Sequence, residues 1–216
     1  MTLLYKSTRD AENIVSASQA ILQGLATEGG LYVPTELPKL TLDFDELAKQ
    51  SYQEVAFTIM SAFYPDFTEE ELRHCIHSAY DDKFDDAAIA PVVKKGNDYY
   101  LELFHGSTIA FKDMALSILP YLMTTSAKKN GVDSEIVILT ATSGDTGKAA
   151  MAGFADVPGT KIIVFYPRDG VSKIQEKQMV TQKGDNTYVV AIDGNFDDAQ
   201  STVKALFNDE ALKQKL

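Results

Sequence analysis

The spacing of apolar positions predicts a mainly helical region over residues 1–90. Near its start, apolar side chains recur three or four residues apart, as on one face of a helix, until Gly29-Gly30 ends the pattern. These positions are Ile14, Ala17, Ile21 and Leu25. Residues 31–34 read as a short extended piece. We therefore expect a helix and then a strand in the first part of the chain.

Two longer helices are predicted further along this region, over residues 45–63 and 69–80. The first is expected to end at Tyr64-Pro65, because proline cannot continue a helix without losing a backbone hydrogen bond. The second follows Thr68, and Glu71 lies three residues later. Threonine followed at that distance by glutamate is the capping-box pattern, which indicates the start of a helix.

The pattern then changes to short extended runs. Runs over 91–94 and 99–104 flank the turn-forming stretch 95–98, which predicts a β-hairpin. A helix should follow, kinked by Pro120 and ended by Asn130-Gly131. Its apolar positions are Met114, Ile118, Leu119, Leu122 and Met123.

Strands and helices alternate regularly in the remainder of the chain. Strands are predicted at 135–140, 161–165 and 187–192, and helices at 146–154, 172–182 and 197–207. Strands that alternate with helices in this way form parallel β-α-β units. The predicted fold class is therefore α/β, with a parallel sheet that follows a mainly helical amino-terminal region.

Composition and charge narrow the class of protein. The chain has 216 residues, of which 45% are hydrophobic and 24% charged, as in a soluble folded protein. Its formal net charge of −11 disfavours nucleic acid as a partner. No apolar run reaches the length of a membrane span, and the first residues lack a signal-peptide pattern. We expect no nucleic-acid or membrane partner and a cytoplasmic location.

The single cysteine, Cys75, excludes an internal disulfide and fits a reducing compartment. His74 and His77 flank it on a predicted helix, but no third type of ligand lies nearby in the sequence. Structural metal sites need more ligands than these residues supply. We therefore predict no metal site.

The first segment that can carry chemistry is 104–113, between an extended run and a helix. It contains Lys112, which follows Phe111. Partial desolvation favours the uncharged, nucleophilic form of an amine, and such a lysine can form a Schiff base with an aldehyde cofactor. The alternative is a solvated lysine beside Asp113, which is the commoner case. The local pattern leaves both open.

The second segment is 140–148, between a predicted strand and a helix. It places Ser143, Gly144 and Thr146 at a helix N-terminus, where backbone N–H groups and hydroxyls can bind a carboxylate or a phosphate. The alternative is that Asp145 only caps the helix and the glycines only form the turn.

Three well-known site motifs are absent. The P-loop pattern needs glycine where Thr142 stands and serine or threonine where Ala149 stands, which argues against ATP or GTP. The dinucleotide pattern G-x-G-x-x-G does not occur in the sequence, and neither does the serine-hydrolase pattern G-x-S-x-G.

Taken together, these segments resemble threonine synthase, a family that depends on pyridoxal phosphate. In that family a phrase close to F-H-G-P-T-x-A-F-K-D contains the cofactor lysine, and A-T-S-G-D-T-G follows it. The matching phrases here are 105–113 and 141–147. Further matches to the family occur at 5–9, 24–34, 165–167 and 171–179. The chain is therefore similar to the amino-terminal part of a threonine synthase.

The resemblance implies a tryptophan-synthase-like fold and the conversion of O-phospho-L-homoserine and water to L-threonine and phosphate. It implies that Lys112 carries pyridoxal phosphate as a Schiff base and shuttles protons between substrate carbons. The loop expected to receive the substrate's α-carboxylate comprises Thr142, Ser143, Gly144, Asp145 and Thr146. Asp145 also belongs to the expected cofactor site. Because a carboxylate facing the cofactor's phenolate oxygen would be repelled, we expect Asp145 to cap the helix or bind backbone N–H groups.

The chain also departs from the family. Ser107 stands where proline is usual, and the glycine-rich loop for the cofactor phosphate is missing. Since family members are much longer, we expect a truncated form. The implied domains are a helical one over 1–90, the start of the large cofactor domain over 91–112, and a small α/β domain over 113–216. Two alternatives stay open: a non-catalytic folded fragment, or another pyridoxal-phosphate enzyme of the same fold type, related to cysteine synthase or threonine dehydratase. The oligomeric state is left open.

Overall fold

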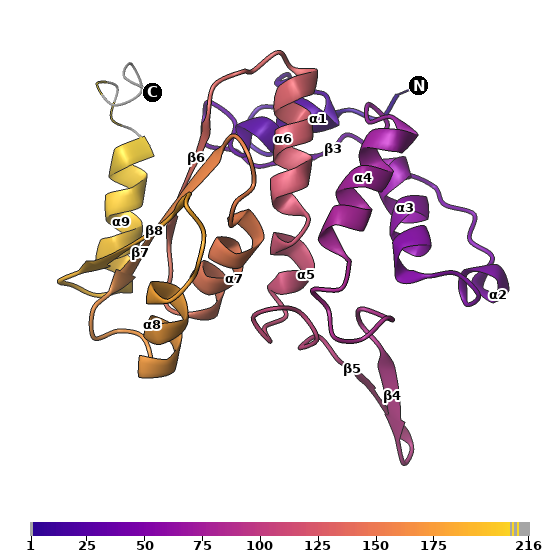
Figure 1. Ribbon diagram of the computed structural model, residues 1–216. Coiled ribbons are helices and arrows are strands. Elements are labelled where there is room, and N and C mark those ends of the chain that lie inside the picture. The colour runs from indigo at the N-terminus through magenta and orange to yellow at the C-terminus, as the bar shows by residue number, and fades with distance from the viewer. Residues whose placement is uncertain (1, 208, 210, 212–216) are drawn as a thin grey trace. The chain divides into compact units, whose positions relative to one another are not determined.

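The structure is a computed structural model that describes residues 2–207, 209 and 211. The chain divides into two compact units, and Figure 1 labels most of their helices and strands. Unit 1 consists of Met1–His105 and Ile118–Asp133, and unit 2 of Gly106–Ser117 and Ser134–Leu216.

Unit 1 combines helices with two small antiparallel sheets. Its helices are α1 (Ala17–Gln23), α2 (Phe44–Leu47), α3 (Tyr52–Phe63), α4 (Glu69–Ala79) and α6 (Leu119–Lys129). Its strands are β1 (Tyr5–Ser7), β2 (Ile14–Val15), β3 (Tyr32–Pro34), β4 (Val92–Lys95) and β5 (Asp98–Leu101). The first three strands form one sheet in the order β2-β1-β3, and β4 pairs with β5.

The first sheet corrects the predicted start of the first helix. Ile14 pairs with Lys6 in the ladder between β2 and β1, so it is extended and not helical. Helix α1 begins after Ser16, whose hydroxyl accepts from the backbone N–H of Gln19 in a capping box. The helical spacing that includes Ile14 was therefore misleading, whereas the extended piece at 31–34 is confirmed as β3.

A second cap corrects the predicted helix over 45–63, which is two helices, α2 and α3. Ser51 has extended backbone angles, and its hydroxyl accepts from the backbone N–H of Glu54, which starts α3 as a new helix. The apolar pattern continues across this break, so periodicity alone could not locate it. The predicted capping box of Thr68 and Glu71 is confirmed at the start of α4.

The core of unit 1 lies around α4, which packs against α3 and α6. Its buried face consists of Leu72, Cys75, Ile76 and Ala79. Cys75 Sγ lies 3.4 Å from Thr125 Oγ1 on α6, and burial raises the pKa of the Cys75 thiol. Lys129 Nζ binds Glu71 Oε2 at 2.9 Å between the same two helices. Cys75 is thus a buried structural thiol.

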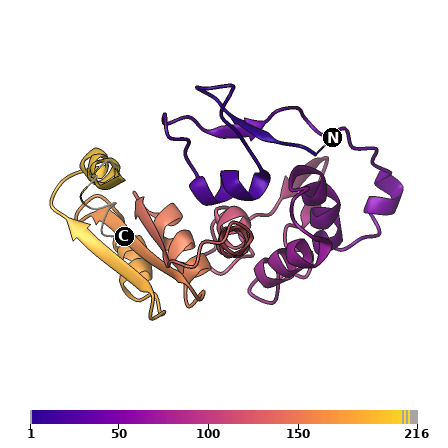
Figure 2. The same cartoon turned by 90° about the horizontal axis from the view of Figure 1, so that it is seen from above.

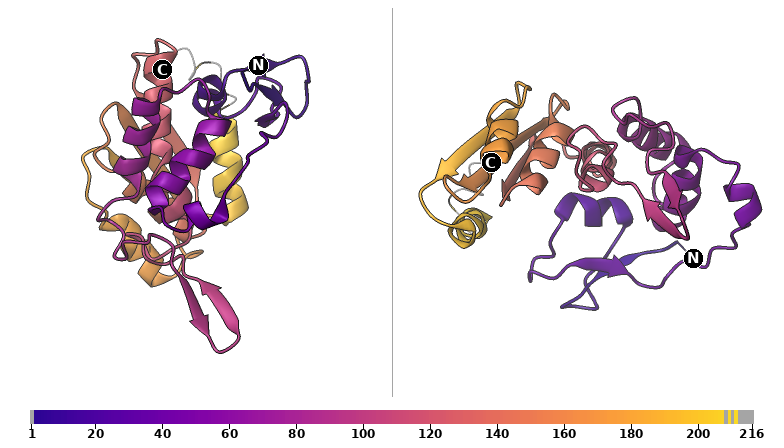
Figure 3. Two further views of the ribbon diagram at one scale, coloured as in Figure 1. Left: turned by 90° about the vertical axis from the view of Figure 1, so that its right-hand side faces the viewer. Right: turned by 90° about the horizontal axis from the view of Figure 1, so that it is seen from below.

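The predicted hairpin is confirmed as β4 and β5, joined through Gly96 at a φ of 63°. It extends away from the helices of unit 1, as Figure 3 shows in magenta. Its exposed large side chains include Val92, Tyr99, Tyr100 and Leu101. The hairpin therefore has little packing within its own unit.

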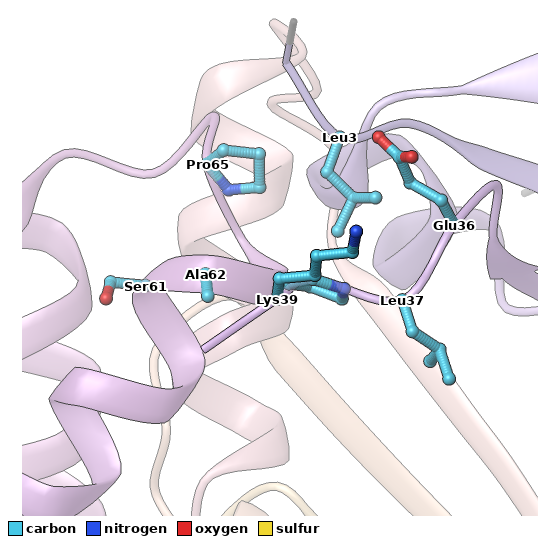
Figure 4. A pocket seen from close by; sticks show the side chains of 8 residues that line it. Leu3, Glu36, Leu37, Lys39, Ser61, Ala62 and Pro65 are labelled. Atoms are coloured by element: carbon cyan, nitrogen blue, oxygen red, sulfur yellow. The ribbon is translucent and has the colours of Figure 1, made fainter. Parts of the chain in front are cut away.

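An open hollow of about 480 Å³ lies in unit 1 between the segment after β3 and the end of α3 (Figure 4). It is lined by Leu3, Glu36, Leu37, Pro38, Lys39, Ser61, Ala62 and Pro65. Neither of the two chemically suggestive segments contributes a residue to it. The hollow is therefore distinct from the predicted site.

Unit 2 is a three-layer α/β arrangement. Its strands are β6 (Ile136–Ala141), β7 (Thr160–Pro167) and β8 (Thr187–Ile192). Its helices are α5 (Asp113–Leu116), α7 (Asp145–Phe154), α8 (Lys173–Val180) and α9 (Phe196–Phe207). The strands are parallel in the order β6-β7-β8, with α7 and α8 on one face and α9 on the other (Figure 2). The predicted alternation of strands and helices, and with it the α/β fold class, is confirmed.

The central strand β7 forms the core of this sheet. Its alternate side chains Ile162, Val164 and Tyr166 are buried. Gly147 on α7 lies directly over Val164, since a Cβ there would come within 2.8 Å of Val164 Cγ1. Helix α7 therefore sits close to the sheet.

The single kinked helix predicted around Pro120 is also wrong. The chain forms α5 and then α6, with Ile118 as the N-cap of the second helix. Pro120 lies in the first turn of α6, where a backbone N–H has no helical acceptor and its absence costs nothing. Asn130 ends α6 as predicted, with Gly131 following at a φ of 66°.

Among the described residues, no helix is both long and apolar enough to cross a membrane. The predicted division into domains refers to the longer enzymes of the family, and it stays a prediction.

Candidate functional site

Residues 106–113 of the first segment and the whole of the second segment lie in unit 2, at the same end of helices α5 and α7. Leu116 at the end of α5 lies against Gly153 near the end of α7. Asp113 at the start of α5 interacts electrostatically with Lys148, one turn into α7. The two helices therefore run side by side in the same direction. Lys112, which precedes α5, lies toward the N-terminus of α7.

The loop before Lys112 is held by the buried carboxylate of Asp113, which is 2% exposed. Its two oxygens accept from the backbone N–H of Thr108 at 2.8 Å and from the Thr108 hydroxyl at 2.6 Å. Gly106 packs on the same carboxylate, because a Cβ there would lie 2.6 Å from Asp113 Oδ2. The residue next to Lys112 thus fixes the path of the loop that leads to it.

Lys112 itself is half-buried at the N-cap position of α5. Its Nζ lies 4.6 Å from the centre of the Phe111 ring, within the range of a cation–π contact. No ion-pair partner for this amine is found in the described part of the chain, Asp113 included, because that carboxylate is bonded to Thr108. The structure thus shows a half-buried Lys112 beside Asp113 without an ion pair between them, and the role of the lysine stays a prediction.

The second segment is organised by Thr142, which is 2% exposed. Its Oγ1 accepts from the backbone N–H groups of Gly144 at 3.0 Å and Gly147 at 2.9 Å, and donates to the Gly144 carbonyl. One hydroxyl therefore provides a hydrogen-bond acceptor both for a backbone N–H group of the loop and for one in the first turn of α7. The buried side chain of Thr142 therefore stabilises the loop from within and is not accessible to a ligand.

The turn into α7 requires glycine at residue 144. Gly144 has a φ of 152° and a ψ of −109°, which side chains with a Cβ do not adopt readily. On either side of it, Ser143 and Thr146 are exposed. Within the described structure, the backbone N–H groups of Ser143, Asp145 and Thr146 have no acceptor. Free donors at the start of a helix favour binding of an anion.

Asp145 does not cap this helix, which corrects the prediction for its side chain. Gly144 is the N-cap residue, and no side chain bonds the cap. Asp145 Oδ1 instead accepts from Nε2 of Gln175 on α8 at 2.8 Å. Its carboxylate is thus held toward the neighbouring helix.

Two residues of this region had no predicted role. Gln175 belongs to the matching phrase 171–179, which gave a resemblance but no chemistry. Lys148 is half-buried, its Nζ is hydrogen-bonded to the side chain of Gln182, and burial lowers its pKa. No local pattern marks such a lysine, because its neighbours Gln182 and Asp113 come from distant parts of the sequence.

Comparisons of the sequence with known proteins all find similarity to threonine synthases. Residues 4–80 match the family described as threonine synthase N terminus. The chain is 41% identical to the threonine synthase of Pseudomonas aeruginosa, over 95% of this chain and 44% of that protein. It is 40% identical to the threonine synthase of Escherichia coli, over 96% of this chain and 47% of that protein.

Solved structures agree with the sequence comparison. The PLP-bound threonine synthase from Brucella melitensis superposes with a TM-score of 0.87 and 37% identity, over 97% of this chain and 45% of that one. The yeast enzyme superposes with a TM-score of 0.88 and 33% identity, over 97% and 44%. The chain therefore spans somewhat less than half the length of the relatives that it matches.

Proposed function

We propose that the chain is the amino-terminal part of a threonine synthase, which converts O-phospho-L-homoserine and water to L-threonine and phosphate with pyridoxal phosphate on Lys112. The observation that supports this most is the arrangement within unit 2. An amine without an ion-pair partner in the described residues lies toward the helix end that presents free backbone donors. A substrate that carries an amino group and a carboxylate on one carbon suits such a pair of groups.

The residues present fit an aldehyde cofactor. The Nζ of Lys112 is available for a covalent bond, and Asp113 holds the preceding loop in place. When bound, pyridoxal phosphate supplies an electron sink for negative charge that develops on substrate carbons. Lys112 Nζ would hold the cofactor through a covalent bond and, once the substrate's amino group has taken its place there, would be free to move protons between those carbons.

The loop at the start of α7 binds and orients the substrate. The backbone N–H groups of Ser143, Asp145 and Thr146, with the exposed hydroxyls of Ser143 and Thr146, receive its α-carboxylate. Gly144 allows the turn, and Thr142 braces it from beneath. Asp145 lies at the rim of the cofactor site, with its carboxylate turned toward Gln175.

The wider proposals follow from the family. The region over 1–90 is the helical amino-terminal domain, 91–112 begins the large cofactor domain, and 113–216 supplies the small α/β domain. We place the protein in the cytoplasm, where its single thiol stays reduced.

Trapping the cofactor on the lysine tests this proposal. The chain is mixed with pyridoxal phosphate and reduced with borohydride, and the modified lysine is mapped by peptide mass. We expect the label on Lys112 and its loss in Lys112→Ala. The matched control is Lys148→Ala, which removes the other half-buried amine near the site and should keep the label on Lys112. A label that is lost in Lys148→Ala, or one that is spread over surface lysines, contradicts the assignment of Lys112.

Substrate choice separates this function from the related pyridoxal-phosphate enzymes. Release of inorganic phosphate from O-phospho-L-homoserine, with L-threonine as the other product, supports threonine synthase. Turnover of a serine or threonine substrate in its place would assign the protein to the cysteine synthase or threonine dehydratase relatives.

A further inference from the structure

We propose that Gln175 is a positioning residue that holds Asp145 and Gly144 so that the start of α7 stays open to the substrate's carboxylate. The proposal rests on the function proposed above and deepens it. Gln175 is the third helical residue of α8, which follows β7, whereas the loop that it contacts follows β6.

The orientation of the Gln175 amide is fixed from both ends. Its Oε1 accepts from the backbone N–H of Ser172 at 3.2 Å, as part of the capping box that starts α8. Its Nε2 donates to Asp145 Oδ1 at 2.8 Å. Because a backbone N–H can only donate and an ionised carboxylate can only accept, a flipped amide would lose both bonds. Gln175 therefore presents a fixed donor to Asp145.

The same amide lies directly on the backbone of Gly144. A Cβ on Gly144 would overlap the Gln175 side chain, and Gly144 is the residue that makes the turn into α7. Gln175 thus contacts the loop at two consecutive residues. The turn and the direction of the Asp145 carboxylate are set by one side chain.

This contact matters because Asp145 carries a negative charge at a helix end that attracts anions. A carboxylate in the first turn of a helix is itself stabilised by the free N–H groups there. Released from Gln175, the Asp145 carboxylate could turn back onto those donors and compete with a bound carboxylate. The hydrogen bond to Gln175 holds it to the α8 side.

Gln175→Glu tests this link with little effect on the fold. Glutamate at the third helical position retains the capping box with Ser172, so α8 keeps its start. The donor to Asp145 is replaced by a second carboxylate, which repels it. The double variant Asp145→Asn with Gln175→Glu reverses donor and acceptor and restores the bond, since the amide introduced on α7 can donate to the carboxylate introduced on α8.

The first readout needs no ligand and uses the chain itself. Backbone amide NMR signals of Ser143, Gly144 and Thr146 should shift in Gln175→Glu and return toward the wild-type positions in the double variant. A residue that served only to cap α8 would leave those three signals unchanged in Gln175→Glu. That result, or a double variant that resembles Gln175→Glu, would overturn the proposal.

The second readout compares binding of two probes, O-phospho-L-homoserine and 3-aminopropyl phosphate, which is the same molecule without its carboxylate. In wild type the first should bind more tightly. Gln175→Glu should weaken it by about tenfold or more, leave 3-aminopropyl phosphate unchanged, and be rescued in the double variant. Equal weakening of both probes contradicts the proposal. Wild type that does not discriminate between the probes contradicts the proposed function, and the NMR signals then still decide the role of Gln175.

Discussion

At the scale of single residues, the loop before Lys112 contains a strained position. Ile109 has a φ of 61°, a left-handed conformation that costs a β-branched residue about 1–2 kcal/mol, and its side chain is 72% exposed. Asparagine tolerates this conformation better, and little packing is lost on replacement. We expect Ile109→Asn to raise the free energy of unfolding by about 1 kcal/mol, measured by urea denaturation.

The matched control for this change is Ile174→Asn. Ile174 is 73% exposed and lies within α8, at an ordinary helical position. The same substitution should there leave stability unchanged or slightly lower. Equal effects at both positions would show that the gain at Ile109 does not come from the backbone conformation.

The bond between Thr108 and Asp113 supports a second prediction. Both side chains are buried, and the Thr108 hydroxyl donates to Asp113 Oδ1 at 2.6 Å. Thr108→Val keeps the shape but leaves that oxygen without its donor, which should lower the free energy of unfolding by about 1.5–3 kcal/mol. The control Thr202→Val removes an exposed hydroxyl on α9 and should change it by less than about 0.5 kcal/mol. A comparable loss in both variants would refute a special role for the buried bond.

At the scale of elements, the contact of α7 with the sheet predicts an unusual sign for a glycine substitution. In a helix, alanine is about 1 kcal/mol more favourable than glycine. A Cβ on Gly147, however, would lie 2.5 Å from Thr142 Cγ2 and 2.8 Å from Val164 Cγ1. We expect Gly147→Ala to destabilise the chain by about 1–3 kcal/mol in thermal unfolding, because α7 must move off β7. Thr146→Ala, at the exposed neighbouring position, serves as the control. A stabilised Gly147→Ala chain would mean that the helix is free to shift.

The elements that the sequence predicted well are those whose signals are local. The strands and helices of unit 2 alternate as expected, and Thr68 with Glu71 starts α4. The errors occurred where apolar spacing continued through a cap or a pairing partner far along the chain. Ile14 is apolar at helical spacing but pairs with Lys6, and Ser51 starts a new helix inside an apolar pattern. Neither event is visible in the period of apolar residues.

For the candidate site, the sequence indicated individual residues but not the contacts between them. Lys112 and the residues around Gly144 became candidates because they lie in loops between an extended run and a helix, and their predicted roles came from the resemblance to threonine synthase. The partner of Asp145 was not predicted, since the bond to Gln175 joins residues from two different β-α units. The neighbours of Lys148, Gln182 and Asp113, likewise lie far from it along the sequence. Contacts of this kind follow from the tertiary structure and leave no local signature.

At the scale of the whole chain, the phrase that leads to Lys112 is divided between the two units, and His105 is the last residue on the unit 1 side. Its Nδ1 lies 2.6 Å from Asp85 Oδ1 and its Nε2 3.0 Å from Glu102 Oε2, while Phe104 stacks on the ring. Both ring nitrogens face carboxylates, which only a protonated imidazole can satisfy by donating twice. Hydrogen bonds that the imidazolium donates to Glu102 and Asp85, with the charge of Asp86 nearby, raise the pKa of His105.

This arrangement gives stability a defined dependence on pH. Because the folded-state pKa of His105 is raised above its unfolded value of about 6.5, the imidazolium contributes stability that is fully present below that value and is lost as pH rises through the folded pKa. His105→Gln removes the charge and leaves the carboxylates of Asp85 and Glu102 facing a neutral group. The difference in Tm between wild type and this variant should therefore be larger at about pH 5.5 than at about pH 9. A difference that is constant with pH would show that His105 stabilises its surroundings by packing under Phe104, not by charge.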